Sequence, residues 1–189
     1  MDKPKLYFVK ADLQDAFGSV DIDELKSILT KLHTDYQNTE TNMVKKKAAA
    51  TEYKKLIQEL SSSVLVRWGS CVYKWKRGLI QGMKYSPILC EIFYNAIDAK
   101  YLSDFICESE NEINFFIRLV DDYLFVTNNI DTAQNFIQHL SKFININPKK
   151  TKTNFIEENG GISDKITFFG YEINTKNLEI TRDNTVYYG

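Results

Sequence analysis

The sequence predicts an α+β fold in which helices cover one face of an antiparallel sheet. Three short runs, at 5–11, 115–127 and 166–173, are rich in β-branched and aromatic residues and are typical of strands. Between them, apolar residues recur at helical spacing behind residues that commonly begin helices. The order is strand, helix, insertion, helix, hairpin, helix, hairpin, which favours an antiparallel sheet with its helices on one side.

The composition is that of a globular chain of about one domain. Its 189 residues are 43% hydrophobic, enough for a substantial core. The formal net charge of −1 does not mark a nucleic-acid-binding protein, which is usually basic. Acidic and basic residues are nevertheless clustered, as expected of a metal site beside a basic track. For the cluster Lys45–Lys47 we favour an ordinary solvated helix face.

The cysteine and histidine patterns argue against several classes of protein. The three cysteines, Cys71, Cys90 and Cys107, are widely spaced without a C-x-x-C pair, and the two histidines lack ligand-like spacing. We therefore expect neither a zinc site nor a disulfide framework, which fits a reducing intracellular compartment. The N-terminus lacks the apolar run of a signal peptide, and no window is as long as a membrane span, so we expect no membrane partner.

The first predicted strand, 5–11, ends at Asp12. A carboxylate on a rigid strand is well placed to hold a metal ion, although Asp at a strand end is also a common turn former. Asp21 then predicts the N-cap of an amphipathic helix over 22–33.

Residues 33–77 are interpreted as an insertion, and the segment after them as a ligand-binding loop. The expected elements of the insertion are a polar loop over 33–42, a helix over 42–60, and strands over 64–68 and 72–76 around Gly69-Ser70. Gly78 and Gly82 then bracket a loop where the backbone could approach a ligand closely. Ser86 and Pro87 predict the start of a helix that ends near Phe105. The alternative is a plain glycine-containing loop before a core helix.

Asp121 and Asp122 stand between two apolar runs, where a polar pair predicts the tip of a β-hairpin. Adjacent carboxylates repel each other unless a positive charge neutralises them. Hard oxygen ligands favour Mg²⁺ or Mn²⁺. The alternative is an Asx-type turn with two solvated acids.

The last third of the sequence predicts one more helix and one more hairpin. Asp131 is expected to cap the helix, and 153–157 to form a short strand. The runs 166–173 and 178–181 are expected to pair, and Gly170 inside the first of them suggests a bulge or a close backbone approach.

One carboxylate at a strand end and two at a hairpin tip suit a two-metal site, in which the ions lie about 3.5–4 Å apart. Such ions hold the attacking hydroxyl and the departing pyrophosphate oxygen in line, so the protein supplies positioning and charge stabilisation. The sequence has no His or Cys constellation for hydrolysis, and its motifs therefore favour nucleotidyl transfer.

In this order, the motifs resemble the palm of a reverse transcriptase, and most closely that of telomerase reverse transcriptase. The resemblance covers nearly the whole chain, and Leu-Val before the two acids points to the telomerase branch. The matching segments are Phe8–Phe17 (motif A), Gly78–Gly82 (motif B′), Leu119–Thr127 (motif C), Asn147–Thr151 with Asn154-Phe155 (motif D), and Phe168–Gly170 with Thr175–Glu179 (motif E, the primer grip).

The resemblance implies a site for two Mg²⁺ ions, with Mn²⁺ as a possible substitute, held by Asp12, Asp121 and Asp122. Lys150 would be a fourth catalytic residue that approaches the triphosphate and protonates the leaving pyrophosphate. The alternative for Lys150 is a solvated lysine.

The resemblance also implies contacts with the incoming nucleotide. Leu13 and Phe17 would contact it, with Phe17 under the sugar, where it excludes a 2′-hydroxyl. Gln81 and Gly82 would border the nascent base pair and the template. The alternative for Phe17 is a core aromatic.

Phe168, Phe169 and Gly170 would support the primer end, although both phenylalanines could equally be core residues. The chain departs from the family pattern at four places, which loosens the fit of the template loop and primer grip and leaves the three aspartates intact. The departures are Gly18 for an acid, Ile80 for Pro, Met83 for Ser, and Phe168-Phe169 for Trp-Cys.

The implied organisation is a palm with one insertion. Its parts are 1–32 (palm, motif A), 33–77 (a small fingers-type insertion), 78–165 (palm, motifs B′, C and D) and 166–189 (primer-grip hairpin and start of the thumb). The implied partners are a telomerase RNA template, a telomeric DNA primer, deoxynucleoside triphosphates, and the fingers, RNA-binding domain and thumb of the polymerase. The implied location is the nucleus, at telomeres. We expect a fragment or truncated product that has weak or no polymerase activity alone.

Three alternatives stay open. A retroelement or retron reverse transcriptase would share the chemistry. A palm-fold nucleotidyl cyclase would use metal-binding acids without a template, and the segments that resemble motifs B′, D and E argue against it. A truncated, non-catalytic palm would only bind nucleic acid or protein, and the three intact aspartates argue against long decay.

Overall fold

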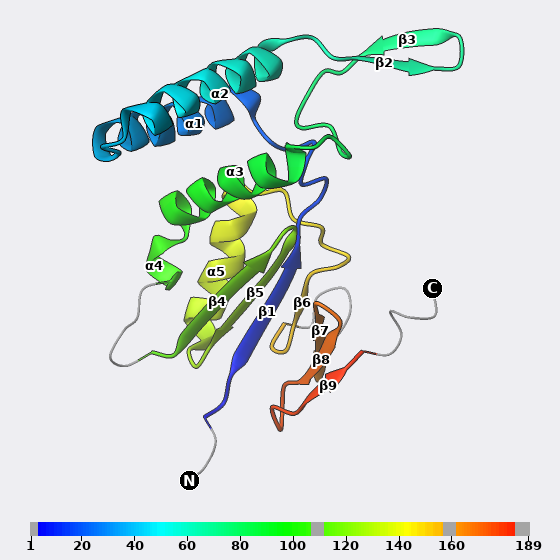
Figure 1. Cartoon of the computed structure of the whole chain (residues 1–189). Coiled ribbons are helices and arrows are strands. Elements are labelled where there is room, and N and C mark those ends of the chain that lie inside the picture. Colours follow the sequence, from blue (N-terminus) through cyan, green and yellow to red (C-terminus); the bar gives the residue numbers. More distant parts are fainter. Residues whose placement is uncertain (1–3, 107–111, 157–161, 184–189) are drawn as a thin grey trace. The chain divides into compact units, whose positions relative to one another are not determined.

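The computed structural model describes residues 4–106, 112–156 and 162–183. The chain divides into two compact units, the first made of residues 1–16 and 97–189 and the second of residues 17–96. Figure 1 shows the order of helices and strands along the chain. Cys107 lies outside the described residues, and the predicted part boundaries at 33, 78 and 166 stay predictions.

The first unit contains a four-stranded antiparallel sheet in the order β4-β5-β1-β6 (Figure 1). The N-terminal strand β1 is therefore central, although it is far in sequence from both of its neighbours. The strands are β1 (Tyr7–Asp12), β4 (Asn114–Leu119), β5 (Asp122–Thr127) and β6 (Lys152–Thr153). β6 has only two residues, so the longer strand expected over 153–157 is wrong within the described residues.

Helices cover one face of this sheet, as the sequence predicts. Helix α5 (Ile130–Phe143) contacts both central strands, and the short helix α4 (Ser103–Ile106) contacts β4. Side chains of β5 that point to this face are fully buried, because alternate residues of a strand share a face. Phe125 stacks on Phe136 of α5 with ring centroids 4.3 Å apart.

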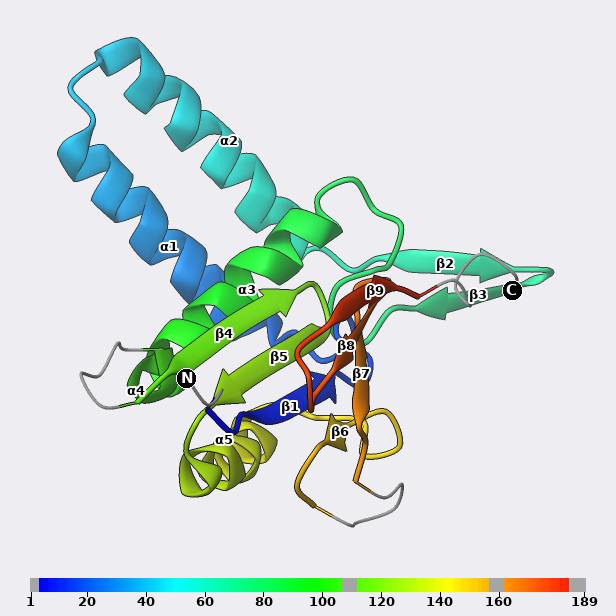
Figure 2. The same cartoon turned by 90° about the horizontal axis from the view of Figure 1, so that it is seen from below.

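The opposite face carries a second, three-stranded antiparallel sheet rather than a helix. Its strands are β7 (Lys165–Phe168), β8 (Tyr171–Asn174) and β9 (Ile180–Arg182), which lie beside β1 in Figure 2. Apolar residues of the two sheets form a buried cluster, namely Phe8, Leu124, Val126, Ile166 and Phe168. The expected α+β class with helices on one face is confirmed, and the C-terminal hairpins supply the second cover.

The predicted strand over 166–173 is wrong, because the chain reverses inside it. Phe168 pairs with Tyr171, so Phe169 and Gly170 form a two-residue turn between β7 and β8. Both turn residues have positive φ, 48° and 75°, which is the requirement of a type I′ hairpin turn. Gly170 therefore allows a turn and not the expected bulge.

The second unit contains the helical pair α1 (Ile22–Thr39) and α2 (Met43–Ser61), the hairpin β2–β3 (Leu65–Trp68 and Cys71–Lys74), and most of helix α3 (Ser86–Tyr101), whose end belongs to the first unit. Asp21 caps α1 as predicted, since its carboxylate accepts hydrogen bonds from the N–H groups of Asp23 and Glu24. The predicted start of α3 is confirmed, and α3 ends at Tyr101 before the separate turn of α4.

The loop predicted over 33–42 is wrong, because α1 continues to Thr39. This stretch is polar and has no apolar stripe, and its helical conformation is stabilised by packing against α2. His33 stacks on Tyr53 of α2 at 4.2 Å between ring centroids. The connection is then only Glu40 to Asn42, where the Asn42 N–H donates to the Glu40 carboxylate at 2.9 Å and lowers the pKa of that group.

Asn129, and not Asp131, caps α5. Its side-chain oxygen accepts hydrogen bonds from the N–H groups of Asp131 and Thr132. Both Asn and Asp are good N-cap residues, so the local sequence did not decide between Asn129 and Asp131 as the cap. No helix in the described ranges is both long and apolar enough to cross a membrane.

Candidate catalytic site

The turn between β4 and β5 carries Asp121, and Asp122 is the first residue of β5. Leu119 pairs with Asp122, so the predicted hairpin is confirmed, with its two-residue turn at Val120-Asp121, one position before the predicted Asp121-Asp122 tip. Val120 has φ of +55°. A β-branched residue in this region is an outlier and marks a place where the surrounding structure holds the backbone.

The sheet brings Asp12 to the same place. In the antiparallel pairing of β1 with β5, Asp12 is directly opposite Asp122. One residue further, the Leu13 N–H donates to the Asp121 carbonyl at 2.8 Å. Asp12 is buried, with 6% of its surface exposed, and Asp121 and Asp122 are half-buried. The three acidic positions are thus brought together by main-chain hydrogen bonds across 109 residues of sequence separation between Asp12 and Asp121.

Lys10 is a site residue that the sequence reasoning missed. Its Nζ lies 2.6 Å from Asp122 Oδ1 and 3.7 Å from Asp12 Oδ1, and its side chain is 11% exposed. Residues two apart on a strand share a face, so a lysine two positions before the strand-end aspartate was the available signal. A buried lysine needs a partner, and here it has two carboxylates.

Lys150 reaches the same carboxylate from the loop after α5. Its Nζ lies 3.3 Å from Asp12 Oδ1, and its side chain is 62% exposed. The loop is held against the end of β1, because the Asn147 N–H donates to the Asp12 carbonyl at 2.7 Å. The Asn147 carbonyl in turn accepts from the N–H groups of Lys150 and Thr151. The backbone of Lys150 is therefore anchored by hydrogen bonds, and its long, exposed side chain reaches Asp12.

The donor set fits a hard divalent cation. The site offers carboxylate oxygens, which Mg²⁺ and Mn²⁺ prefer. Lysine ammonium groups contact Asp12 and Asp122 and supply the positive charge that a metal ion would otherwise supply there. Within residues 4–106, 112–156 and 162–183, no three side chains of His, Cys, Asp or Glu lie together as a ready-made metal-binding group. The carboxylates would have to exchange lysine contacts for metal contacts.

A buried polar network supports the turn from below. The Asp98 carboxylate accepts hydrogen bonds from Arg118 Nε at 2.6 Å and from the Tyr123 hydroxyl at 2.7 Å. The Arg118 side chain is only 3% exposed, and its Nη1 donates to the Val120 carbonyl at 3.2 Å. Helix α3 thus fixes the strained turn residue through Arg118. No pattern in the sequence marks Asp98, which looks like a polar position on an amphipathic helix.

Leu13, the nucleotide-contact residue expected in the first unit, is buried. It is 4% exposed and forms an isolated bridge with Ile146. The side chain therefore packs under the site, while its backbone N–H holds the turn residue Asp121.

The other predicted nucleotide contacts belong to the second unit. Phe17 is half-buried, and its carbonyl accepts a hydrogen bond from the Leu79 N–H at 2.8 Å. Gly78 has φ of +68°, and a Cβ there would lie 2.4 Å from the Phe17 carbonyl oxygen. Gln81 and Gly82 are exposed, and space is open around Gly82. Gly78 is thus required for close packing of its loop on Phe17.

The predicted primer-grip residues differ in exposure. Phe168 is buried at 9% exposure and belongs to the cluster between the two sheets. Phe169 is 70% exposed at the tip of the β7–β8 turn. Gly170 follows it in the turn, and its carbonyl accepts a hydrogen bond from the Asp183 N–H at 2.9 Å. Only Phe169 and Gly170 therefore offer surface to another molecule.

An antiparallel sheet backed by helices, with one aspartate on a central strand and two at the adjoining turn, defines the class of the protein as a polymerase palm of the reverse transcriptase type. Residues 2–173 match the Reverse transcriptase (RNA-dependent DNA polymerase) family. The chain belongs to this family.

Relatives that match the chain are telomerase reverse transcriptases. That of Tetrahymena thermophila is 29% identical over 107 residues, which cover 52% of this chain and 10% of the relative. That of Oryzias latipes is 24% identical in an alignment that covers 100% of this chain and 23% of the relative. The chain spans less than a quarter of the length of these two relatives, and the expected resemblance to telomerase reverse transcriptase is confirmed.

Solved telomerase structures have the same fold. Apo telomerase from Candida tropicalis, truncated from its C-terminal domain, aligns with a TM-score of 0.72 and 25% identity over 94% of this chain and 35% of that chain. Another apo telomerase structure from Candida tropicalis aligns with a TM-score of 0.74 and 23% identity over 97% of this chain and 33% of that chain. The palm fold predicted from the sequence is confirmed.

Proposed function

We propose that this chain is the palm of an RNA-templated DNA polymerase that extends telomeric DNA 3′ ends. The observation that carries the proposal is the pairing of Asp12 with Asp122 across β1 and β5, with Asp121 in the adjoining turn. Family membership and the telomerase relatives support the choice of reaction. The chain would act as part of a longer polymerase, since it spans a small share of those relatives.

The cofactor that we propose is a pair of Mg²⁺ ions, for which Mn²⁺ could substitute, held by Asp12, Asp121 and Asp122. When bound, the ions would activate the primer 3′-hydroxyl and neutralise the departing pyrophosphate. Lys10 would hold the Asp122 carboxylate in place beside Asp12 through its ammonium group.

Lys150 would hold a proton at its Nζ near the leaving group. Its exposed side chain has the length to leave Asp12 and reach the pyrophosphate oxygen, and an ammonium can act as a general acid there. The hydrogen bond from Asn147 to the Asp12 carbonyl would keep the loop in range.

The binding roles that we propose follow the family resemblance. The Leu13 backbone and Phe17 would contact the incoming nucleotide, with Phe17 excluding a 2′-hydroxyl. Gln81 and Gly82 would border the nascent pair and template. Phe169 and Gly170, supported by buried Phe168, would contact the primer end.

The proposed partners are a telomerase RNA, a telomeric DNA primer, deoxynucleoside triphosphates, and the fingers, RNA-binding domain and thumb. A solved telomerase from Candida albicans, whose structure holds a TWJ fragment of telomeric RNA, aligns with a TM-score of 0.70 and 22% identity over 96% of this chain and 31% of that chain. The proposed location is the nucleus, at telomeres.

Primer extension by the full-length polymerase that carries this palm tests the proposal. With Mg²⁺, its RNA and a telomeric primer, Asp121→Ala should lower the extension rate by about 100-fold or more, as expected when charge stabilisation at the reacting centre is removed. Asp131→Ala removes an equally charged but exposed residue in the first turn of α5 and should extend primers normally. If Asp121→Ala extended primers at the wild-type rate, Asp121 would not belong to the catalytic site.

A further inference from the structure

The β2–β3 hairpin in the second unit is a second candidate site. Leu65 pairs with Lys74 and Trp68 with Cys71, and every residue of both strands is exposed. Within the part of the chain that the structure describes, neither strand pairs with a third. An isolated two-stranded hairpin is marginally stable in water, so an exposed one with large apolar side chains is expected to have a binding partner.

Aromatic side chains gather on one face of this hairpin. Opposed and alternate residues share a face, which places Trp68 and Tyr73 together, and Trp75 continues the same alternation. Trp68 is 78% exposed and Tyr73 is 55% exposed. Both tryptophans of the chain are in this segment. The Trp75 indole N–H donates to the Gly78 carbonyl at 3.2 Å, which fixes that ring at the base of the hairpin.

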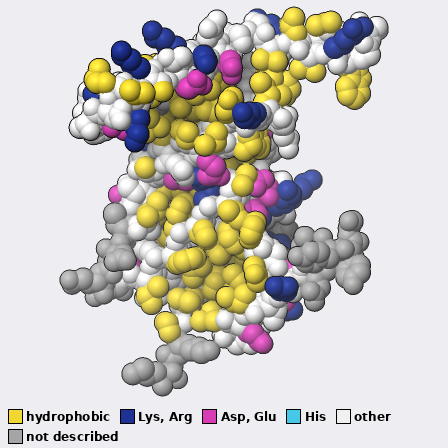
Figure 3. Space-filling view, viewed as in Figure 1, with side chains coloured by type: hydrophobic (Ala, Val, Ile, Leu, Met, Phe, Trp, Pro, Cys, Tyr) yellow, Lys and Arg dark blue, Asp and Glu magenta, His cyan; other side chains and the backbone are white. Residues whose placement is uncertain are grey.

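The same segment is strongly basic. Residues 60–90 contain five basic residues and no acidic residue, whereas the whole chain has a formal net charge of −1. Arg67 and Lys74 lie on the face opposite to Trp68. Stacked sheets pack only about 10 Å apart and the Debye length is about 10 Å at 0.1 M salt, so charges on one face of a sheet are only partly screened from a phosphate at the other face. Figure 3 shows basic and hydrophobic side chains side by side over this hairpin.

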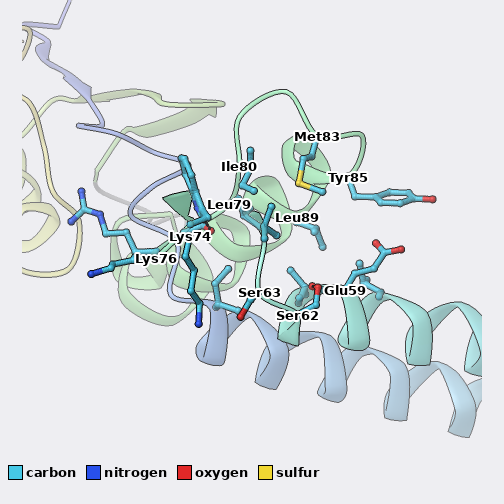
Figure 4. Close-up of a pocket in the computed structure, with 17 residues that line it drawn as sticks. Glu59, Ser62, Ser63, Lys74, Lys76, Leu79, Ile80, Met83, Tyr85 and Leu89 are labelled. Carbon is cyan, nitrogen blue, oxygen red and sulfur yellow. Dashed lines mark hydrogen bonds between the residues drawn. The ribbon is translucent and has the colours of Figure 1, made fainter. Parts of the chain in front are cut away.

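A cavity at the base of the hairpin continues this chemistry. Its volume is about 260 Å³, just under the range of about 300–1,000 Å³ for ligand pockets, so it suits one ring rather than a large molecule. Side chains of both kinds line it (Figure 4), including Leu60, Leu79, Lys74, Lys76 and Arg77, with Glu59 as the one acid.

We propose that the hairpin site, defined as Arg67, Trp68, Tyr73, Lys74 and Trp75, binds single-stranded nucleic acid. Bases would stack on the aromatic face, and the basic residues would neutralise phosphates, the combination that sequence-tolerant single-strand binding uses. The absence of acidic residues from 60–90 favours a phosphate backbone over a protein segment as the occupant. This inference goes beyond the proposed polymerase function, because it is argued from the hairpin alone and adds a contact away from the aspartates.

Binding of the 189-residue chain to labelled 20-nucleotide DNA and RNA single strands, titrated over a range of salt, tests the inference. Trp68→Ala with Tyr73→Ala should weaken binding about 30-fold or more at constant salt slope, because two stacking contacts are lost and charge is kept. Arg67→Gln with Lys74→Gln should lower the salt slope by about 1.4, since each phosphate contact contributes roughly 0.7 on a single strand. Comparing the DNA and RNA arms shows which strand the site prefers.

Lys45→Gln with Lys47→Gln removes the same charge from exposed positions of α2 and is the matched control. Its salt slope should equal that of the wild-type chain. The aromatic variant should leave binding to a duplex of the same length unchanged, because paired bases are unavailable for stacking. The four residues altered in the hairpin are exposed, so the hairpin variants should have the melting temperature of the wild-type chain.

Equal single-strand affinity of the aromatic variant and the wild-type chain would overturn the inference, as would an equal slope change in the α2 control. The inference would also be overturned if Trp68→Ala with Tyr73→Ala abolished binding to a purified protein segment and left nucleic acid binding intact. Asp121→Ala should bind single strands normally. If full-length Asp121→Ala extends primers while the hairpin variants lose single-strand binding, the proposed function fails and this inference stands.

Discussion

Two hairpins of this chain share one local geometry and have different surroundings. The β4–β5 hairpin closes with Val120-Asp121, and the β2–β3 hairpin closes with Gly69-Ser70. In each, the first turn residue has positive φ, +55° for Val120 and +60° for Gly69. Glycine adopts this conformation at no steric cost, while a β-branched residue in a sparsely populated region costs roughly 1–3 kcal/mol.

The difference shows where strain can persist. Strand β5 is buried on both faces, and Arg118 holds the Val120 carbonyl from a buried pair with Asp98. The β2–β3 hairpin has no buried residue in either strand, so it has nothing to offset strain and uses glycine. A strained valine next to two aspartates therefore indicates a turn whose position is imposed by the packing around it.

Removal of the support should have the largest effect. Asp98→Ala would leave the Arg118 guanidinium buried without its carboxylate, and breaking a buried pair costs about 3–5 kcal/mol. We expect a fall of this size in the free energy of unfolding, measured by urea denaturation of the 189-residue chain. Asp98→Asn keeps an acceptor for the Tyr123 hydroxyl and should lose less. Equal urea midpoints for Asp98→Ala and the wild-type chain would show that the Asp98–Arg118 pair does not stabilise the turn.

Relief of the strain should have a smaller effect of opposite sign. Val120→Gly removes the strained Cβ at a smaller entropic cost, so we expect the free energy of unfolding to rise by about 1 kcal/mol. In the full-length polymerase, the same variant should extend primers more slowly, because a freer backbone holds Asp121 less precisely. A lower melting temperature for Val120→Gly would mean that the turn conformation is not strained.

The reverse change in the exposed hairpin should have the smallest global effect. Gly69→Val introduces the same strain where no buried contact holds the strands. We expect global unfolding to change by less than about 0.5 kcal/mol, as at most surface sites, while amide exchange rises locally over β2 and β3. A global loss comparable to that of Asp98→Ala would show that this hairpin is part of the cooperative core.

Much of the site could be predicted because its signals are local. Asp12 at a strand end and Asp121-Asp122 at a turn are visible in short windows of sequence, and so is the cap at Asp21. Local signals also misled. The polar run 33–42 looked like a loop because its support comes from α2, and Phe169-Gly170 looked like strand because its turn residues are flanked by apolar runs on both sides.

The sequence by itself determined the fold class, the order of the elements and the three acidic positions, because periodicity, caps and turn residues act over a few neighbouring residues. Only the tertiary structure decided that β1 is central, that Lys10 bridges Asp12 and Asp122, and that Asp98 holds Arg118 under a strained valine. Asp98 and Arg118 are 20 positions apart, and Lys10 and Asp122 are 112 positions apart. These contacts form because burial forces each charge to find a partner wherever the folded chain supplies one.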